Sequence, residues 1–273
     1  MKNYCLICHK SNLKFYLWNN HKINQCNNCD FLFIDQQLKK KINNTSTSNI
    51  LYHGTKHEDK NREDLFSNTI AKPRILYYQK LLKRKITNIL EVGCGTAASS
   101  KGFLNNNIDY TGLENNRSIY NFGKKKNRNI IYGDFLKKKL KKYDIIFASQ
   151  VLEHFIDPNA FISKCKKILN KNGIIHLDLP NNSSWVSICR KFLPGKKHFG
   201  ALEPFDHLRA YSPKSLKNLF LKHGLKPRLV DSFENDHRTF GQLVNKISIH
   251  KKIFFSLQNI FNAKSLLVGV AQN

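Results

Sequence analysis

The chain lacks any long apolar stretch. None of its 273 residues belong to a run of roughly twenty apolar residues, the length that a membrane-spanning helix needs. A secretory signal peptide is not expected either, because a paired-cysteine motif begins at Cys5, directly after the first few residues. The seven cysteines are an odd number and are scattered, which favours a reducing compartment. We therefore expect a cytoplasmic protein.

Acidic residues are scarce as well. There are 19 of them against 46 lysines and arginines, so the formal net charge is +27. Such an excess ordinarily indicates a nucleic-acid or anionic-membrane partner. Only nine of the basic residues are arginines, however, and a coding bias can produce a lysine excess of this kind. The lysine runs at 124–126 and 137–139 contain no aromatic residues on which bases could stack. We interpret these runs as solvated faces, with a phosphate or lipid-headgroup patch as the alternative.

Four of the cysteines form two close pairs near the N-terminus. Cys5-x-x-Cys8 and Cys26-x-x-Cys29 are separated by seventeen residues, a spacing that can bring four thiolates around one tetrahedral Zn²⁺. Disulfides are the alternative, but cysteines two residues apart are hard to bridge to each other. Residues 1–42 are therefore predicted to form a zinc ribbon whose metal is structural, because four thiolates leave no free coordination position.

A glycine turn between two apolar runs is the most informative motif. The run 89–92 contains Glu91 and leads into Gly93-Cys94-Gly95, and a second apolar run ends in Glu114 twenty-one positions after Gly93. A strand, a glycine turn, a helix and a second strand with a terminal carboxylate are typical of a site for a ribose-bearing cofactor. Glu114 and its neighbour Asn115 are the candidates for contact with the ribose.

The identity of the cofactor depends on smaller features. The same turn fits the dinucleotide pattern Gly-x-Gly-x-x-Gly/Ala, so a nicotinamide cofactor is an alternative. Glu91 favours S-adenosylmethionine, because a carboxylate there can receive an ammonium group but would repel a pyrophosphate. Asp134 and Phe135 follow the next apolar run and could hold an adenine. Gln150 ends the strand after that and is a further cofactor-binding candidate.

Four motifs in order resemble class I S-adenosylmethionine-dependent methyltransferases. They are Glu-x-Gly-x-Gly at 91–95, the acid at 114, Gly-Asp at 133–134 and Val-Leu-Glu-His-x-x-Asp-Pro at 151–158. The small-molecule branch, which includes quinone and sugar methyltransferases, is the most similar. The resemblance runs from about Tyr77 to the C-terminus and implies S-adenosylmethionine as the cofactor. The N-terminal ribbon resembles the zinc-binding domain at the front of some deoxysugar and cell-surface-sugar methyltransferases. Ala97 departs from the pattern, since many relatives carry a third glycine, and we expect an ordinary backbone conformation there.

Alternating strand and helix patterns predict the fold. Strands are expected at 88–92, 109–113, 129–132, 143–149, 173–179, 225–233 and 265–271. Helices are expected from Pro73 onward and from Pro158 to Leu169, the second ended by Asn172-Gly173. The predicted class is α/β, with a doubly wound, mostly parallel seven-stranded sheet of the Rossmann-like methyltransferase type and a small N-terminal zinc ribbon. The expected divisions are the ribbon, a linker with a first helix at 43–72, and the methyltransferase domain at 73–273.

Two histidines are candidate bases for removing a proton from an acceptor. His154 follows the fourth strand of the core, and His207 lies in a polar segment beside Asp206, which could orient it. For both, a role in substrate binding or in shaping the pocket is the alternative. Glu153 is expected to anchor its loop by hydrogen bonds. Ser212 and Pro213 are expected to begin a helix as its N-cap and first residue.

Residues 180–215 and 234–264 are expected to form the acceptor-side loops and a lid. Apolar residues recur at helical spacing between Phe240 and Phe261, beside a basic flank at 246–252. We expect this stripe to pack on its own protein. The alternative is peripheral contact with an anionic membrane, in which case the acceptor would be a lipid-linked sugar or a quinone.

The predicted function is methyl transfer to a small molecule. The family resemblance favours a sugar of a surface-polysaccharide or glycoside pathway, in nucleotide-linked or lipid-linked form. An RNA methyltransferase, ribosomal or other, is the first alternative, because some such enzymes also carry a zinc ribbon and because the charge suits nucleic acid. No Asn-Pro-Pro-Tyr-like signature follows the fourth strand, which makes nucleic acid the less favoured partner. A non-catalytic cofactor-binding scaffold is the second alternative.

Overall fold

The computed structural model describes residues 4–34, 56–193, 198–203, 206–233 and 264–273. The chain divides into two compact units. The core unit comprises Ser46–Val151, Ala160–Leu177 and Ala271–Asn273, and the ribbon unit comprises Met1–Thr45, Leu152–Asn159 and Asp178–Val270. In the described part of the chain, every helix falls short of the length and apolarity that a bilayer crossing requires.

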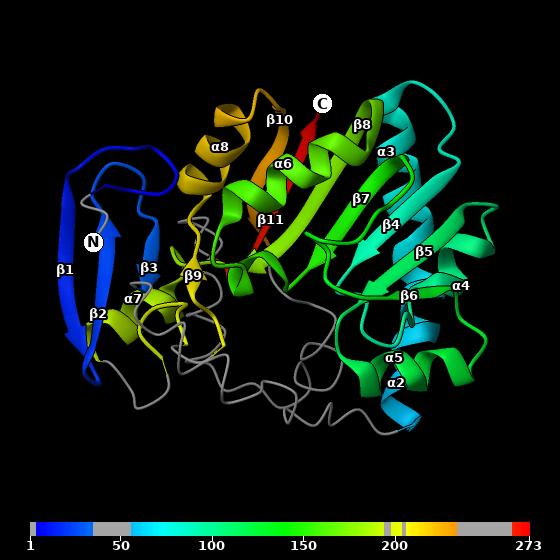
Figure 1. The fold of residues 1–273 in the computed structure, drawn as a ribbon, viewed down its shortest axis with the longest axis horizontal. Helices are drawn as coiled ribbons and strands as arrows, with labels where there is room; N and C mark the ends of the chain where they lie inside the picture. Colours follow the sequence, from blue (N-terminus) through cyan, green and yellow to red (C-terminus); the bar gives the residue numbers. More distant parts are fainter. Residues whose placement is uncertain (1–3, 35–55, 194–197, 204–205, 234–263) are drawn as a thin grey trace, which may run out of the picture. The chain divides into compact units, whose positions relative to one another are not determined.

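A seven-stranded sheet has the order β10-β11-β8-β7-β4-β5-β6 (Figure 1). β4 pairs in parallel with β5 on one side and with β7 on the other, and β5 pairs in parallel with β6. Strand order thus reverses beside β4, and such a switch point is where open α/β sheets bind ligands, beyond the carboxyl ends of the strands. The predicted α/β class with its mostly parallel sheet is confirmed. The strands are β4 Asn88–Val92, β5 Asp109–Glu114, β6 Ile130–Tyr132, β7 Tyr143–Ser149, β8 Leu169–Pro180, β10 Lys226–Phe233 and β11 Leu266–Gln272.

The first helices of this fold come before β4 in the sequence. A helical segment runs through α2 Lys56–Leu65, the π-helix η3 Phe66–Ile70 and α3 Ala71–Leu82. Pro73 lies in the first turn of α3, where the missing amide hydrogen is tolerated, but it does not begin the helix. Further helices are α4 Ser100–Leu104, α5 Arg117–Lys125 and α6 Pro158–Ile168. Asn116 caps α5 by accepting hydrogen bonds from the backbone amides of Ser118 and Ile119.

The expectation that Asn172-Gly173 ends a helix was wrong. α6 ends at Ile168, and β8 begins at the next residue. A methyl group on Gly173 would lie 3.0 Å from the carbonyl oxygen of Asp144, at the start of β7. The glycine therefore allows two backbone segments to approach closely, and this role leaves the same sequence pattern as a helix C-cap.

The ribbon unit contains a second sheet, with the order β1-β2-β3-β9 (Figure 1). Its strands are β1 Leu13–Trp18, β2 His21–Cys26, β3 Leu32–Ile34 and β9 Arg209–Ala210, and each neighbouring pair is antiparallel. The unit also contains the short 3₁₀ helix η4 Leu152–His154 and the helices α7 Trp185–Phe192 and α8 Pro213–Lys222. Ser212 caps α8 in a capping box with Pro213 at its first turn, as predicted.

The apolar core of the ribbon is built from distant parts of the sequence. Trp18, Ile23, Leu32 and Ile34 come from the N-terminal strands. They pack with Phe199, Ala201, Leu202 and Ala210, and all eight side chains are buried. Since a hairpin of this size buries little apolar surface by itself, the later segments are part of what makes the ribbon stable.

Candidate functional site

The glycine turn after β4 has the geometry of a ligand cradle. The amides of Gly93 and Cys94 both donate to the carbonyl oxygen of Leu113, at 2.8 and 3.1 Å. Gly93 has φ +63°, and a methyl group there would lie 2.6 Å from Cγ2 of Val151, so only glycine fits. Gly95 has φ +58° and faces open space, since none of the described residues except its immediate neighbours comes within 4 Å of where a Cβ would be. A ligand can therefore approach the backbone at Gly95.

Glu114, at the carboxyl end of β5, is attached to this turn. Its carboxylate accepts hydrogen bonds from the amide of Gly95 at 2.9 Å and from the amide of Asn116 at 2.8 Å. Burial raises the pKa of Glu114, and these amides oppose the rise. Asn115 is exposed beside it. A carboxylate offers about four acceptor positions, so Glu114 keeps capacity for hydroxyl donors such as those of a ribose.

Glu91 is buried at the end of β4 and is bonded to two hydroxyl groups. Its carboxylate accepts from the hydroxyl of Ser99 and from that of Tyr110, the latter at 2.6 Å. Burial and the charge of Glu91 raise the pKa of Tyr110 well above its usual value, so this phenol remains a neutral donor. The two hydroxyls set the orientation of the carboxylate that the sequence assigns to an ammonium group.

The expectation of an ordinary backbone at Ala97 was wrong. Ala97 has φ +58° and is fully buried. Its amide donates to the carbonyl of Cys94 at 2.9 Å, and its own carbonyl accepts from Ser100 at 3.1 Å. These bonds hold the turn in the left-handed conformation even though alanine disfavours it by roughly 1–2 kcal/mol. Burial also raises the pKa of the Cys94 thiol well above its usual range, so the thiol is neutral.

The other predicted cofactor residues lie at the ends of β6 and β7. Asp134 is exposed, and its carboxylate accepts from the amide of Leu136 at 2.8 Å. Phe135 is buried, with its ring centre 5.0 Å from that of Phe161. Gln150 follows β7 directly with φ +56°, a conformation that is uncommon outside glycine and occurs often at functional sites. That these residues bind the cofactor stays a prediction.

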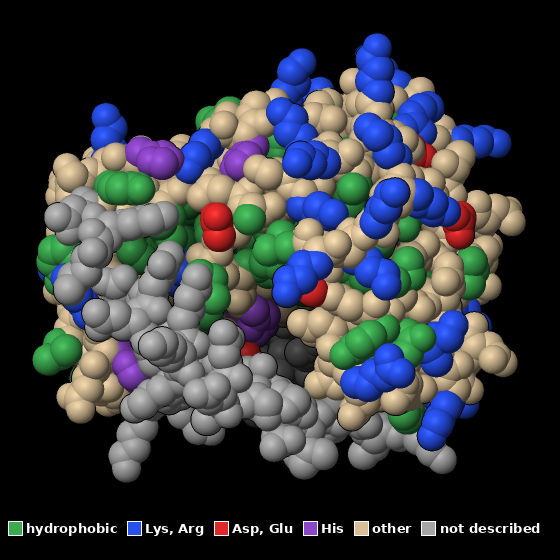
Figure 2. Space-filling model, in the orientation of Figure 1, with side chains coloured by type: hydrophobic (Ala, Val, Ile, Leu, Met, Phe, Trp, Pro, Cys, Tyr) green, Lys and Arg blue, Asp and Glu red, His purple; other side chains and the backbone are tan. Residues whose placement is uncertain are grey.

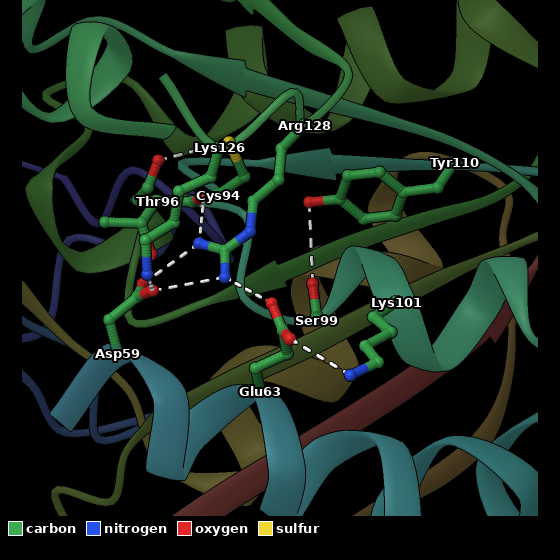
Figure 3. A network of polar contacts seen from close by, with 10 residues as sticks. Asp59, Glu63, Cys94, Thr96, Ser99, Lys101, Tyr110, Lys126 and Arg128 are labelled. Atoms are coloured by element: carbon green, nitrogen blue, oxygen red, sulfur yellow. Dashed lines mark hydrogen bonds and ion pairs between the residues drawn. The ribbon is translucent and has the colours of Figure 1, made fainter. Parts of the chain in front are cut away.

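Asp59, a buried acid on α2 that the sequence analysis did not identify, is hydrogen-bonded to the glycine turn that follows β4 (Figure 3). Asp59 is fully buried and accepts hydrogen bonds from the hydroxyl of Thr96 and from Lys126. Arg128 donates to it twice, at 3.0 and 3.1 Å, and also to the carbonyl of Thr96 at 2.9 Å. Glu63 forms a further ion pair with Arg128. Burial alone would raise the pKa of Asp59, but its donors outweigh burial and lower the pKa to about 2.

The four paired cysteines converge as predicted. The thiol sulfurs of Cys5 and Cys29 are 3.6 Å apart, and those of Cys8 and Cys26 are 3.4 Å apart. All four sulfurs lie within 4.8 Å of one another, and none of the seven cysteines is in a disulfide. A hydrogen bond from Cys29 lowers the pKa of the Cys5 thiol to about 5. Four thiols at this spacing fit a tetrahedral Zn²⁺.

The two Cys-x-x-Cys turns have matching backbones. Cys5 is followed by a turn in which the amide of His9 donates to its carbonyl at 3.1 Å, and the amide of Asp30 donates in the same way to Cys26 at 2.8 Å. His9 and Asp30 both have positive φ, at +57° and +58°. The amide of Ile7 also donates to the sulfur of Cys5 at 3.4 Å. Such N–H···S contacts would stabilise a thiolate.

The candidate bases His154 and His207 lie together in the ribbon unit. Their ring centres are 5.1 Å apart, in an edge-to-face arrangement. Asp206 was expected to orient His207, but its carboxylate lies 3.1 Å from Nδ1 of His154 and 3.7 Å from Nε2 of His207. Nδ1 of His154 also donates to the carbonyl oxygen of Asp206 at 2.9 Å. The stronger partner of Asp206 is therefore His154.

These contacts give the two histidines different pKa values. Burial opposes protonation of His154, but the hydrogen bond from its ring to Asp206 and the charge of Glu153 outweigh burial and raise its pKa to about 9. Burial and the neighbouring His154 cation lower the pKa of His207. Near neutral pH, His154 is then a cation and His207 a neutral base.

Glu153 does not anchor its loop through its side chain, contrary to expectation. It is fully buried, and neither carboxylate oxygen has a hydrogen-bond partner among the described residues. Burial raises its pKa to about 7. Its backbone carbonyl instead accepts from the amide of Leu208 at 3.0 Å. Glu153, His154 and His207 also place ligand atoms within 4.8 Å of one another, close enough for one divalent cation.

Residues of the predicted lid lie mostly outside the described residues. This holds for 234–263, including the apolar stripe from Phe240 to Phe261 and its basic flank. Among the acceptor-side loops, His198 and Glu203 are described, with His198 Nδ1 3.7 Å from a carboxylate oxygen of Glu203. Lys196 and Lys197 lie outside.

The sequence matches proteins named for methyl transfer. A ubiquinone biosynthesis O-methyltransferase of Coxiella burnetii is 25% identical over 118 residues, which cover 40% of this chain and 50% of that protein. The corresponding protein of Pelagibacter ubique is 29% identical over 107 residues, covering 36% and 44%. The chain thus spans about half the length of the curated relatives that it matches.

Solved structures share the fold. The plantazolicin methyltransferase BpumL in complex with SAH matches with a TM-score of 0.53 and 16% identity, over 88% of this chain and 91% of that one. A SAM-dependent methyltransferase from Archaeoglobus fulgidus matches with a TM-score of 0.53 and 19% identity, over 77% and 97%. A family model described as a methyltransferase domain matches residues 56–230, well over half of the chain. The chain therefore belongs to this methyltransferase domain family, with the class I fold.

Proposed function

We propose that the protein transfers a methyl group from S-adenosylmethionine to a small-molecule acceptor. The cradle at Gly93–Gly95 carries this proposal. Gly95 opens onto free space, and its amide is bonded to the carboxylate of Glu114. Glu91, Gly93, Cys94, Gly95, Glu114, Asn115, Asp134, Phe135 and Gln150 are the residues proposed to bind the cofactor. When bound, S-adenosylmethionine supplies a methyl group on a sulfonium sulfur.

The acceptor is proposed to carry a hydroxyl group. The ribbon resembles that of sugar methyltransferases, and the matched relatives are named for O-methylation in ubiquinone biosynthesis. A sugar hydroxyl and a phenolic hydroxyl share the requirement for a base that removes their proton. We favour a sugar, nucleotide-linked or lipid-linked, and a quinone-type phenol is the competing acceptor. For the lipid-linked forms the protein would touch an anionic membrane, and its proposed location is the cytoplasm.

His207 is proposed to be the base. Its lowered pKa keeps it neutral near pH 7, so it can accept a proton from a hydroxyl. His154 is already protonated at that pH and is held by Asp206, so it can donate a hydrogen bond and stabilise an oxygen that is losing its proton. The four thiolates are proposed to bind a structural Zn²⁺.

Titration calorimetry with S-adenosylhomocysteine tests the proposal. Glu114→Ala should weaken binding about 10- to 100-fold, the loss expected for charge-assisted hydrogen bonds to two hydroxyls. Asp109→Asn is a matched control, because Asp109 begins the same strand but is exposed and pairs with Lys141. The control should bind normally. Absence of binding by folded, metal-loaded wild-type protein would refute the proposal.

Radiolabelled S-adenosylmethionine then identifies the acceptor class. Nucleotide-linked sugars, lipid-linked sugars and a catechol are offered in parallel, and label should pass to the sugars. Transfer of label only to the catechol would mean that the acceptor is a phenol and not a sugar.

RNA methylation is a second candidate because of the surface charge. Lys and Arg side chains outnumber acidic ones on the face shown in Figure 2. A protein that binds RNA through many such contacts loses affinity steeply as salt rises. Label transfer to RNA, combined with a steep salt slope, would favour this candidate over the small molecule.

A further inference from the structure

Strand β9 connects the cysteine ribbon to the segment that carries His207. Arg209 and Ala210 pair with Phe33 and Leu32, so β9 is the fourth strand of the ribbon's sheet. It begins two residues after His207. The amide of Ile34 extends the pairing by donating to the carbonyl of Leu208 at 3.3 Å. The segment that carries His207 is thus bonded directly to the strand that follows the last cysteine.

The side chain of Arg209 bridges the cysteine ribbon and residues 152–157, the loop that carries His154 (the histidine loop). It is 2% exposed. Its guanidinium donates to the carbonyl oxygen of Ile34 in the ribbon at 3.0 Å. It also donates to the carbonyl oxygen of Ile156 from Nε at 3.1 Å and from Nη2 at 2.8 Å. Ile156 lies two residues after His154, so one planar, five-donor group holds both the ribbon and the histidine loop.

Three further contacts join residues 208–212 to the loop that carries His154 and to the Cys26–Cys29 turn. The amide of Leu208 donates to the carbonyl of Glu153 at 3.0 Å, next to His154. On the ribbon side, the hydroxyl of Ser212 donates to the carbonyl of Cys29 at 2.9 Å. The rings of Phe31 and Tyr211 have their centres 5.2 Å apart. Residues 208–212 therefore contact the histidine loop on one side and the metal-binding turn on the other.

We propose that Arg209 is a positioning residue through which the four-cysteine ribbon holds His154 and His207 in place. β9 is only two residues long, so its pairing adds little stability by itself and depends on how firmly β3 is held. A metal bound by the four thiolates would supply that rigidity, because it fixes the turn between Cys26 and β3. The ribbon then organises the proposed acceptor side. This inference rests on the proposed role of the two histidines.

Amide hydrogen exchange, read by mass spectrometry, tests the coupling without a known acceptor. The zinc-loaded wild-type protein is compared with the same protein after chelation, and with Arg209→Met and Arg209→Lys. Chelation and Arg209→Met should each accelerate exchange at least about tenfold in peptides covering 152–157 and 206–212, the effect of losing local protection. Peptides covering 88–114 should be unchanged, and affinity for S-adenosylhomocysteine should stay within about twofold, since neither change reaches the cradle's own hydrogen bonds. Re-addition of zinc should reverse the effect of chelation.

Two variants separate positioning from general loss of stability. Arg209→Lys keeps the charge but loses the forked donors, so it should restore part of the protection that Arg209→Met lacks. Arg190→Met, on α7 of the same unit, removes an arginine outside these contacts and should exchange like the wild type. Once an acceptor is known, Arg209→Met should lower kcat with little change in KM for S-adenosylmethionine.

Unchanged exchange at 152–157 and 206–212 after metal extraction would overturn the inference. If Arg209→Met does not fold, Arg209→Lys tests the role of Arg209, and wild-type exchange in that variant at 152–157 and 206–212 would also overturn the inference. The coupling and the proposed function fail in different measurements. Wild-type protein that does not bind S-adenosylhomocysteine would refute the function, whereas the exchange pattern reports on the coupling alone.

Discussion

His154 and His207 show how the surroundings divide the roles of two identical residues. His154 is bonded to Asp206 and lies next to Glu153, and these groups favour its charged form. His207 is more buried and faces the cation of His154, which favours its neutral form. A protonated and a neutral histidine can thus lie side by side near pH 7, because Asp206 and Glu153 stabilise the charge of His154.

NMR titration of the imidazole protons should place the midpoint of His154 near 9. Asp206→Asn should move it toward or below 6.5, because burial then outweighs the remaining charges. The raised pKa means that protonated His154 stabilises the fold. This contribution is complete below about 6.5 and is lost as the pH rises through about 9. A His154 midpoint that does not respond to Asp206→Asn would contradict the assignment.

Asp59 and Asp109 carry the same charge in opposite environments. Asp59 is fully buried beside Lys126 and Arg128, whereas Asp109 is 52% exposed beside Lys141. Removing one partner of a buried ion pair leaves the other charge unpaired in a low-dielectric site, but removing an exposed pair changes little.

Asp59→Ala should therefore lower the free energy of unfolding by about 3 kcal/mol. Asp109→Asn should lower it by less than about 1 kcal/mol. Urea denaturation of both variants measures the difference. Asp59→Ala should also weaken S-adenosylhomocysteine binding, because Thr96 of the glycine turn loses its acceptor. Equal free energies of unfolding for the two variants would show that the Asp59 network does not stabilise the fold.

At the scale of elements, two helices begin with side-chain caps that differ in what else the capping side chain contacts. The side chain of Asn116 accepts from two amides at the start of α5, the helix that it caps, while its backbone amide donates to Glu114. Ser212 caps α8 in a capping box, and its hydroxyl also donates to Cys29 in the ribbon. One residue thus begins a helix and holds the second cysteine turn.

Ser212→Ala should be more destabilising than Asn116→Ala. Loss of a helix cap lowers the free energy of unfolding by about 1 kcal/mol, which is the expected effect at Asn116. Ser212→Ala should lower it by about 2 kcal/mol, since the carbonyl of Cys29 also loses its donor. Thermal unfolding of the metal-loaded proteins compares the two. A smaller effect at Ser212 would mean that its bond to Cys29 is unimportant.

At the scale of the whole molecule, the ribbon has a small core, and the proposed metal site would add to its stability. The core includes four buried side chains from residues 199–210. Between the two cysteine turns, the sulfurs of Cys5 and Cys29 and those of Cys8 and Cys26 make weak contacts with each other, and a metal would replace these contacts with coordination bonds.

Elemental analysis should find about one zinc per chain in protein purified without chelator. Cys8→Ser should reduce that content and lower the thermal midpoint, and chelation of the wild type should have the same effect. Cys189→Ser is the matched control, because Cys189 is exposed on α7 and distant in sequence from the paired cysteines. Full metal loading of Cys8→Ser would exclude the four-cysteine site.

Local patterns determined much of the fold. The strands β4, β5 and β7 could be predicted because a buried parallel strand is a short apolar run bounded by turn residues. Each Cys-x-x-Cys turn also acts over a few residues, and so does the cap at Ser212. In each case the physical cause lies within about one turn or one strand of the residue concerned.

Tertiary structure alone decided the partners of the polar groups. Asp59 lies 37 residues from Thr96, and a polar helix residue gives no local sign that it will be buried under a glycine turn. Asp206 lies 52 residues from His154, and its preference for that ring over its neighbour His207 depends on how two loops fold together. Arg209 falls in the segment 180–215 that the sequence assigns to the acceptor side, yet it is buried in a two-residue strand. Side-chain periodicity reports which face of an element is apolar, whereas hydrogen bonds and ion pairs depend on distances between segments that only the folded chain brings together.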